Sequence, residues 1–334
     1  MHWLGDYLPD AASIAQLQQL PLHPTPTYRY PSRLLQGVPG RKWQQISAFA
    51  DCVKTTSERT LEWCAGKAHL GRLMAHRYGT AVTGLERDKS LCEAGNHLSK
   101  QQGLDVQLAR CDVLSATAQR FMAETDHAVA LHACGDLHRQ LIDLVIDNQV
   151  KRLHLSPCCF HLTVDKHYKP FSSAGKNSGL DLTRTDCRLA VQETVTASAA
   201  EARRRNHKNA WRLGFDQLQR ELRARDDYLP LPSFSDGVLQ TSFKAFCQHA
   251  AALKQLTLPE TVDWARYEYR GWQRLAEVSR MELPRHAFRR VLELWLVLDR
   301  ALYLYQSNYE VHLSCFCERE VTPRNLMISA SFSG

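Results

Sequence analysis

Short apolar runs alternate with helical patterns over the first half of the chain. The runs predict five strands, at residues 59–64, 81–86, 106–111, 128–132 and 152–155. Upstream of the first strand, apolar residues at helical spacing predict a helix over residues 42–53. Alternating strands and helices are typical of a parallel sheet with helices on both faces, and ligands of such sheets bind at the carboxyl ends of the strands. The pattern therefore predicts an α/β fold with a binding site along that edge.

Beyond Pro157 the alternation gives way to helical patterns alone. Helical spacing recurs at residues 187–204, 206–223, 240–256 and 260–281. Pro284 then begins a further helix whose apolar stripe reaches Tyr305, and two strands follow at residues 309–317 and 326–331. We therefore predict a proline-rich extended arm (residues 1–41), the first part of an α/β core (42–161), a mainly helical insertion (162–283), and the last helix and two strands of the core (284–334).

Length and composition narrow the class of protein. With 334 residues, the chain is long enough for a principal domain with large additions. No apolar run approaches the roughly 20 residues of a membrane span, and the first residues lack the features of a signal peptide. The 11 cysteines are odd in number and follow no secretion signal, so we expect reduced thiols. These features predict a soluble, cytoplasmic protein that does not bind membranes.

Positive charge is concentrated in one part of the predicted insertion. The formal net charge of the chain is +7, and residues 201–225 hold eight Lys or Arg against three Asp or Glu. Arg203, Arg204, Arg205 and Lys208 lie at the centre of this run. Such a run attracts polyanions, although a solvated helix face carries similar charges about as often. These four residues are the candidate substrate-binding residues.

The stretch LEWCAGKAHLGR, residues 61–72, lies where the first strand turns into a helix. In such a unit the free amide groups of the helix N-terminus face a ligand, and small residues let the ligand approach the backbone. Gly66 and Ala68 are small, while Cys64 and Ala68 stand where a dinucleotide-binding turn more often has glycine. By itself the stretch fits either a nucleotide-binding turn or a tight turn without a ligand.

Acidic residues after the next two strands favour the ligand. Glu86 ends the second strand, 20 residues beyond Gly66, where a carboxylate can accept hydrogen bonds from ribose hydroxyls. Asp112 follows the third strand and can meet an adenine amino group, or else cap a helix or lie in a loop. Glu62 precedes the turn, where a carboxylate disfavours a diphosphate and favours a cationic methionine group. This order favours S-adenosylmethionine over a nicotinamide dinucleotide.

The arrangement of Glu62, Gly66, Glu86 and Asp112 resembles the first motifs of class I S-adenosylmethionine-dependent methyltransferases. The resemblance implies a Rossmann-like sheet of seven strands with the last strand antiparallel, and it leaves the helical segment as an insertion after the fifth strand. It also implies S-adenosylmethionine as the cofactor. The candidate cofactor-binding residues are Glu62, Cys64, Ala65, Gly66, Lys67, Glu86, Arg87, Asp112, Val113 and His132.

Two further stretches narrow the resemblance. LHACGDL (residues 131–137) and SPCCFH (156–161) resemble a methyltransferase subfamily. That subfamily includes the methyltransferase domain of the glutathione-S-transferase C-terminal-domain-containing protein and, more distantly, the eukaryotic tRNA 2'-O-methyltransferase of the acceptor stem. The likeness covers residues 42–161 and resumes over residues 285–330, which contain TPRNL (322–326). The resemblance implies methyl transfer as the reaction more specifically than it implies which molecule accepts the methyl group.

Methyl transfer from a sulfonium is an in-line displacement that depends mainly on positioning. A hydroxyl acceptor is also helped by a base with a pKa near neutrality, a role open to His132, Asp136 or His161. Asp136 fits equally well as the cap of a helix predicted over residues 137–148. The candidate catalytic residues are His132, Asp136, Cys158 and His161.

Cysteines near the same loops raise the question of a metal. Cys134, Cys158, Cys159 and His161 contain enough soft ligands for tetrahedral zinc. Adjacent cysteines rarely reach one ion, however, and Cys315 and Cys317 lie on a predicted strand with both thiols toward one face. We therefore predict thiols that line the pocket, and no bound metal.

The predicted insertion offers the main clue to the acceptor. Aromatic residues alternate with arginines between residues 264 and 274, a pattern that suits stacked nucleotides beside phosphates. Trp264, Tyr267, Gly271, Leu275 and Val278 also form a helical core stripe, so the aromatics can equally belong to a core. The leading hypothesis is a methyltransferase that acts on tRNA or rRNA, with no obligate protein partner. The alternatives are methylation of a protein side chain or small molecule, and a non-catalytic RNA-binding module with a vestigial cofactor pocket.

Overall fold

The computed structural model describes residues 16–24, 28–53, 59–192, 199–234, 237 and 242–334. The chain divides into two compact units. Unit 1 comprises Met1–Thr196 and Phe288–Gly334, and unit 2 comprises Ala197–Ala287. Within the described residues, no helix has both the length and the apolar character needed to cross a membrane.

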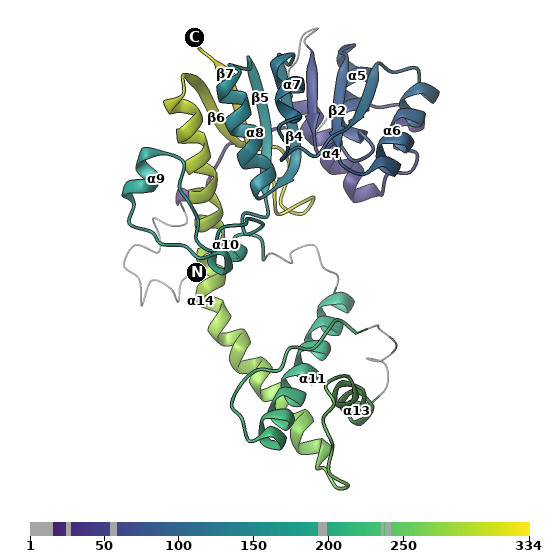
Figure 1. Ribbon diagram of the computed structural model, residues 1–334, viewed down its shortest axis with the longest axis vertical. Helices are drawn as coiled ribbons and strands as arrows, with labels where there is room; N and C mark the ends of the chain where they lie inside the picture. Colours follow the sequence, from purple (N-terminus) through teal and green to yellow (C-terminus); the bar gives the residue numbers. More distant parts are fainter. Residues whose placement is uncertain (1–15, 25–27, 54–58, 193–198, 235–236, 238–241) are drawn as a thin grey trace. The chain divides into compact units, whose positions relative to one another are not determined.

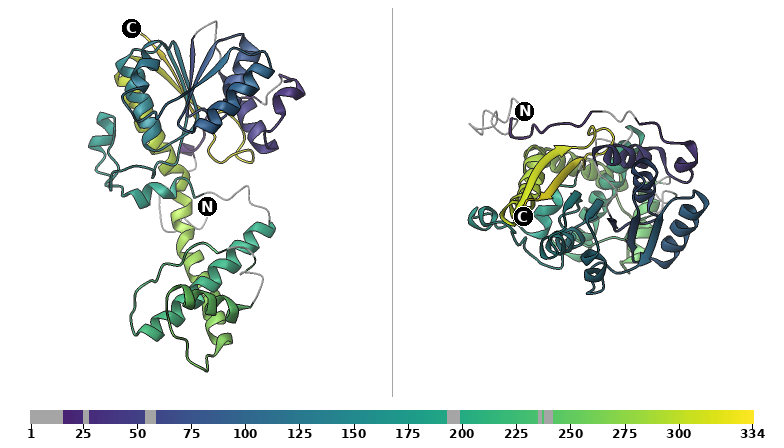
Figure 2. Two further views of the ribbon diagram at one scale, coloured as in Figure 1. Left: turned by 45° about the vertical axis from the view of Figure 1, so that its right-hand side comes forward. Right: turned by 90° about the horizontal axis from the view of Figure 1, so that it is seen from above.

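Unit 1 is built on a seven-stranded sheet with the order β3-β2-β1-β4-β5-β7-β6 (Figure 1). The parallel strands are β1 (Thr60–Trp63), β2 (Val82–Glu86), β3 (Val106–Arg110), β4 (His127–Cys134) and β5 (Arg152–Cys158). The last strand, β7 (Leu326–Phe332), is antiparallel to both of its neighbours, β5 and β6 (Tyr309–Cys315). Figure 2 shows the two closing strands, in yellow, at one edge of the sheet. The predicted α/β class, strand count and antiparallel last strand are confirmed.

Three strands end two or more residues away from the predicted position. β4 continues to Cys134 because a bulge between Leu131 and Ala133 absorbs one residue, His132, whose φ is 62°. β5 also continues, to Cys158. β6 ends at Cys315, so Cys317 does not lie on that strand, and the expected shared face of the two thiols is wrong.

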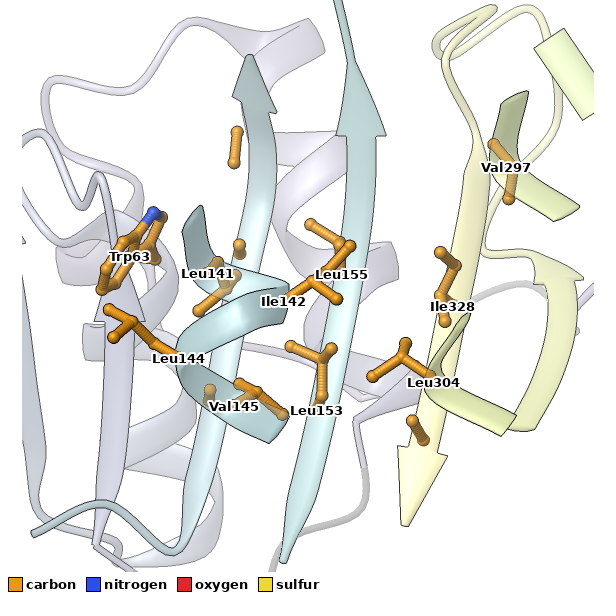
Figure 3. Packing of buried hydrophobic residues seen from close by; sticks show 14 of the residues in the cluster. Trp63, Leu141, Ile142, Leu144, Val145, Leu153, Leu155, Val297, Leu304 and Ile328 are labelled. Atoms are coloured by element: carbon orange, nitrogen blue, oxygen red, sulfur yellow. The ribbon is translucent and has the colours of Figure 1, made fainter. Parts of the chain in front are cut away.

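Helices cover both faces of the sheet because the buried strands have apolar side chains on both sides. Helices α7 (Ala118–Ala123), α8 (Asp136–Asp147) and the C-terminal part of α14 (Trp264–Gln306) pack on one face. Helices α4 (Gly40–Cys52), α5 (His69–Tyr78) and α6 (Lys89–Gln101) cover the other. In β4, Ala128 and Ala130 belong to the first core and Val129 to the second. Figure 3 shows the first core, with Leu141, Ile142 and Val145 of α8 lying over β4 and β5.

Part of the predicted arm is held against the sheet. Cys315 at the end of β6 donates its amide to Pro21 at 2.8 Å, and its carbonyl accepts from the amide of His23 at 2.9 Å. A short helix, α3 (Ser32–Leu35), follows before α4 begins at Gly40. Residues 1–15 and 25–27 of the arm lie outside the described residues.

A buried polar network joins the loop after β5 to α14. The Asp299 carboxylate accepts hydrogen bonds from the Tyr168 hydroxyl (2.6 Å) and from the amides of Phe171 (2.8 Å) and Ser172 (2.9 Å). Arg300 donates to the imidazole of His138 on α8 at 2.8 Å. Short helices α9 (Ser173–Asn177) and α10 (Arg184–Leu189) follow this loop. Because all these groups are buried, the network fixes the loop that borders the site.

Unit 2 consists mainly of α11 (Ala199–Arg223), α13 (Phe243–Leu253) and the N-terminal part of α14 (Trp264–Gln306). Their apolar faces meet in a separate core that contains Trp211, Phe215 and Phe246. Gly271 lets α14 approach α11, since a Cβ there would lie 2.2 Å from the carbonyl oxygen of Ala210.

Two helix predictions in this region are wrong. A single helix over residues 187–204 does not form, because α10 ends at Leu189 and α11 begins at Ala199; residues 193–198 lie outside the described residues. The helices predicted on either side of Pro284 are one helix, α14, with this proline in its interior. A proline lacks the N–H group that would otherwise donate to the Arg280 carbonyl. The helix continues through Pro284 because its apolar faces on either side are buried in the cores of the two units.

Candidate functional site

The turn after β1 has the backbone of a glycine-rich loop. Cys64, Gly66 and Ala68 have φ values of 56°, 59° and 51°. Residues other than glycine rarely adopt this left-handed backbone conformation. Cys64 and Ala68 are the two positions where the sequence has another residue in place of an expected glycine, so the turn keeps the glycine conformation without the glycines. Ala68 directly precedes α5 and gives it no side-chain cap.

Glu62 is a buried carboxylate beside this turn. Its Oε2 accepts a hydrogen bond from the amide of Gly71 in α5 at 2.9 Å. Burial raises the pKa of Glu62 to about 8, and the amide and the charge of Arg72 only partly offset the effect. The carboxylate therefore lacks a full countercharge within the protein, and a cationic ligand group can supply one.

Glu62 lines a cavity of about 480 Å³. We call it the turn cavity. It is bounded by Glu62, Cys64, Ala65 and Gly66 of the turn, by His132, and by residues of α4 that include Lys42 and Gln45. The sequence predicted the helix that holds Lys42 and Gln45 but gave no sign that its polar side faces the site, because no local pattern records that packing.

His132 lines the turn cavity, and one of its two ring nitrogens is a buried acceptor. Its Nε2 lies 3.0 Å from Oε1 of Gln45, whose Nε2 donates to the Val321 carbonyl at 3.2 Å. That network assigns the imidazole hydrogen to Nε2 and leaves Nδ1 as an acceptor. Nδ1 is buried and has no partner among the described residues. Burial also lowers the pKa of His132 to about 4, so the ring is neutral at physiological pH.

A second cavity of about 220 Å³ lies at the ends of β2 and β3. We call it the rim cavity, and it is lined by Cys64, Leu85, Glu86, Arg87, Cys111, Asp112, Val113, Leu114 and Leu137. Glu86 accepts hydrogen bonds from the amides of Gly66 (3.0 Å) and Asp88 (2.9 Å). The exposed Asp112 accepts from the amide of Leu114 at 3.1 Å. Lys67 is exposed and borders neither the turn cavity nor the rim cavity.

The two cavities fit the parts of S-adenosylmethionine. They share Cys64, so one extended ligand can occupy both. Glu62 suits the ammonium group of the methionine end. Glu86 and Asp112 line the rim cavity at the other end, where carboxylates would suit the hydroxyls of a ribose and the amino group of an adenine.

Replacing Glu86 by alanine is expected to weaken S-adenosylmethionine binding by about tenfold or more, because hydrogen bonds to a charged group contribute about 1.5–3 kcal/mol each. Isothermal titration calorimetry measures the change. Glu86→Gln keeps one oxygen for the Gly66 amide and is expected to bind with intermediate affinity. If both variants bind the cofactor as the unmodified chain does, Glu86 does not contact the ribose.

A third cavity, of about 640 Å³, borders the loops after β4 and β5. We call it the loop cavity. Its lining includes Cys134, Asp136, His161, Arg184 and Arg188, and it shares Leu114 and Leu137 with the rim cavity. Its position next to the rim cavity makes it the place where an acceptor can approach a bound cofactor.

Gly135 of the LHACGDL stretch is required by the packing of these loops. Its φ is 53°, and a Cβ there would lie 1.8 Å from the carbonyl oxygen of Leu162. Gly135, rather than Asp136, precedes α8, so the expected capping role of Asp136 is wrong. The Asp136 carboxylate instead accepts from the amide of Val164 at 2.9 Å and holds the loop after β5.

The four candidate catalytic residues lie in three different places. Asp136 and His161 line the loop cavity, His132 lines the turn cavity, and Cys158 is 2% exposed beneath the loops. Burial lowers the pKa of His161, and its Nδ1 has no partner among the described residues. A neutral imidazole with a free nitrogen is suited to accept a proton.

Arg324 is a site residue whose role the sequence did not reveal. It belongs to the TPRNL stretch and is half-buried, and its guanidinium donates to the Val191 carbonyl at 3.0 Å. Its positive charge helps to lower the pKa of both His132 and His161. Arg324 therefore helps to keep both imidazoles neutral.

The basic run in unit 2 has two parts with different surroundings. Arg220 and Arg274 pair with the buried Asp216, each at 2.9 Å, and Arg223 pairs with Asp227 at 2.8 Å. By contrast, Arg203, Arg204 and Arg205 are exposed, Lys208 is half-buried, and none of these four has an acidic partner within 4.0 Å in the described part of the chain. We call these four residues the basic end of α11.

Some aromatic residues of α14 lie in a core, as one interpretation predicts, and others are exposed, as the nucleotide-stacking interpretation requires. Tyr267 is buried and Trp264 packs against the same core, as the core-stripe interpretation predicts. Tyr269 and Trp272 remain 64% and 41% exposed. Trp272 also contacts His207 of α11, with ring centroids 5.9 Å apart. Because His207 is one turn from Arg203 and Arg204, an exposed aromatic surface lies beside the basic end of α11.

Comparison with known proteins identifies part of the chain. Residues 41–166 match a family described as "Methyltransferase domain". No curated protein matches the chain.

Solved structures similar to the chain include three methyltransferases. A tRNA (uracil-54, C5)-methyltransferase from Pyrococcus abyssi is 14% identical over 34% of this chain and 28% of its own length, with a TM-score of 0.28. An RNA methyltransferase from Salinibacter ruber is 14% identical over 40% and 85%, with a TM-score of 0.29. A precorrin-6y C5,15-methyltransferase from Geobacter metallireducens is 13% identical over 36% and 65%, with a TM-score of 0.29. Likenesses at this level carry no argument about the substrate.

The family match covers the strands and turns that form the turn cavity and the rim cavity, and it ends at residue 166, within the loop after β5. The geometry of both cavities suits the cofactor of that family. The chain therefore carries an S-adenosylmethionine-dependent methyltransferase domain.

Proposed function

We propose that this chain methylates RNA, with a tRNA or an rRNA as the substrate. The observation that carries the proposal is the basic end of α11, where Arg203, Arg204, Arg205 and Lys208 have no acidic partners among the described residues. When exposed cations neutralise phosphates, the counterions condensed on the nucleic acid are released, and this release favours binding. The neighbouring Trp272 and Tyr269 offer faces on which unpaired bases can stack.

The residues around the cavities would have three roles: cofactor binding, acceptor binding and proton acceptance. Glu62, Glu86 and Asp112 would hold the cofactor, which when bound supplies an electrophilic methyl group on a cationic sulfur. The loop cavity would hold the acceptor nucleoside, with Arg184 and Arg188 at its border to meet a phosphate. His161 would accept the proton that a hydroxyl acceptor loses.

The pH dependence of the reaction tests the role of His161. Burial lowers the pKa of His161 below the ordinary 6.5, so the fraction of neutral base rises with pH through that lowered pKa and most of the imidazole is neutral at pH 7. We expect kcat/KM to rise with pH below 6.5 and to level off above it. His161→Gln is expected to remove this rise and to lower kcat by roughly 100-fold with little change in cofactor affinity. A variant that keeps the rise would assign the base to another residue.

The proposal is tested by incubating the purified chain with S-adenosylmethionine labelled in its methyl group and separate pools of total RNA, protein and small-molecule extract. We expect label in RNA, and nuclease digestion followed by mass spectrometry then identifies the nucleoside. RNA affinity is expected to fall steeply as salt rises. Label in protein or small molecules alone would favour the second hypothesis, and cofactor binding too weak to detect would favour the non-catalytic module.

A further inference from the structure

Three cysteines converge where the loops after β4 and β5 meet. Cys134 and Cys158 occupy paired positions of neighbouring strands, and their Sγ atoms are 3.3 Å apart. Cys159 follows directly, with a φ of 48°, and its Sγ joins the other two so that all three sulfurs lie within 4.8 Å of one another. Adjacent cysteines rarely reach a common point, and here the left-handed backbone of Cys159 brings its thiol beside that of Cys158.

The spacing of these sulfurs matches a tetrahedral thiolate site. Zn–S bonds of about 2.3 Å place the sulfurs of such a site about 3.8 Å apart. The Sγ atoms of Cys134 and Cys158 are 3.3 Å apart, and no pair in the cluster is more than 4.8 Å apart, so shifts of at most about an ångström suffice. Among common divalent cations, a set of thiolates selects zinc over magnesium or calcium.

The surroundings also suit a bound cation with three thiolates, whose total charge is −1. The guanidinium of Arg324 is near enough for its charge to act on Cys134 and Cys159. The backbone is held in place as well, since the amide of Gly135 donates to the Cys158 carbonyl at 3.1 Å. Cys134 lies in the wall of the loop cavity, while Cys158 is buried behind it.

We propose that Cys134, Cys158 and Cys159 bind one Zn²⁺ ion as three thiolate ligands, with the fourth coordination position toward the loop cavity. The ion would tie the ends of β4 and β5 together and place a Lewis acid in the cavity wall. Because the site is defined by the sulfur positions alone, the proposal does not depend on whether the acceptor is RNA.

The first test measures zinc in the full chain purified in the presence of a reductant. Mass spectrometry of the metal content is expected to give about one zinc per chain. After chelation and replacement by Co²⁺, the chain is expected to show a sulfur-to-cobalt charge-transfer band in the near ultraviolet. Absence of that band, together with zinc binding no tighter than micromolar in competition with a chromogenic chelator, would overturn the proposal.

Variants assign the ligands. Cys134→Ser, Cys158→Ser and Cys159→Ser are each expected to lower zinc affinity by at least tenfold. Cys52→Ser is the matched control, because its thiol donates only to the carbonyls of Ala48 and Phe316, which a hydroxyl can also reach. Circular dichroism and S-adenosylmethionine binding show that each variant is folded. Equal zinc affinity in all four variants would contradict the assignment.

A disulfide between Cys134 and Cys158 is the competing chemistry for two of the same sulfurs. Peptide mapping without a reductant detects it. If that disulfide is present and the fully reduced chain does not bind zinc, the cluster is a redox pair and the zinc proposal is wrong. If the reduced chain binds zinc and the bound zinc protects all three cysteines from alkylation, the proposal is supported.

Discussion

Replacement of Arg203, Arg204 and Arg205 by alanine is expected to lower the affinity of the full chain for RNA by about 100-fold at 0.1 M salt. Each phosphate contact to a single strand contributes a slope of about 0.7 in log K against log salt, so three contacts contribute about two decades at this concentration. The slope itself is expected to fall by about 2. Fluorescence anisotropy with a labelled tRNA at several salt concentrations measures both quantities.

Two control variants test whether RNA binding depends on the basic end of α11 or on the net charge of the chain. Changing Lys89, Lys100 and Lys151, three exposed residues of unit 1, to alanine alters the net charge equally and is expected to leave the affinity within a few-fold. Replacing the three arginines by lysine keeps the cations and is expected to preserve the salt slope. Equal losses from both alanine variants would mean that overall charge, and not the basic end of α11, attracts RNA.

Replacement of Glu62 by glutamine is expected to change both the pH dependence of folding and the affinity for the cofactor. The pKa of Glu62 is about 8 in the folded chain, against an ordinary value of 4.5. Between these values the folded state binds more protons than the unfolded state, so stability falls as pH rises and the full penalty is present above pH 8. Glutamine keeps an acceptor for the Gly71 amide and does not ionise. Without cofactor, the variant is therefore expected to be more stable by as much as roughly 5 kcal/mol at pH 9 and to lose the part of the pH slope that Glu62 contributes.

Cofactor binding is expected to change in the opposite direction. The ionised carboxylate stabilises a cationic methionine group in a buried place, so Glu62→Gln should weaken S-adenosylmethionine binding by roughly 100-fold at pH 8. Binding to the unmodified chain near pH 7 should also release a proton, which calorimetry detects in buffers of different ionisation enthalpy. Urea denaturation at pH 5, 7 and 9 supplies the stabilities, and Glu93→Gln, at an exposed glutamate of α6, is the control. Parallel pH profiles for the unmodified chain and Glu62→Gln would show that Glu62 ionises normally.

The sequence predicted the fold of unit 1 well because its signals are local. Strand and helix periods are read over short windows, and an alternating order leads to a parallel sheet. The errors occurred where tertiary packing overrides a local signal. Pro284 indicated a helix start but lies inside α14, because the apolar stripes on both sides are buried. His132 lies at a bulge that adds residues to β4, which no hydrophobic pattern predicts.

The candidate site was predicted in part for the same reason. Glu62, Glu86 and Asp112 were predicted from their places at strand ends, and the structure brings all three to the cavities at one edge of the sheet. Lys67 was predicted with them, yet its side chain is exposed and borders neither the turn cavity nor the rim cavity. Gln45 and Arg324 were missed because they reach the site from distant parts of the chain.

The sequence by itself determined the order of strands and helices, the residues at the strand ends and the excess of positive charge in one helix. These follow from the covalent order and from the preference of apolar side chains for the interior. Only the tertiary structure decided which charges are neutralised, as for Arg220 and Arg274 against the basic end of α11. It also decided that Glu62 is desolvated and that Cys134, at the end of β4, meets Cys158 and Cys159, at and just after the end of β5. Burial and the contacts between distant segments set these properties, and no short stretch of sequence contains them.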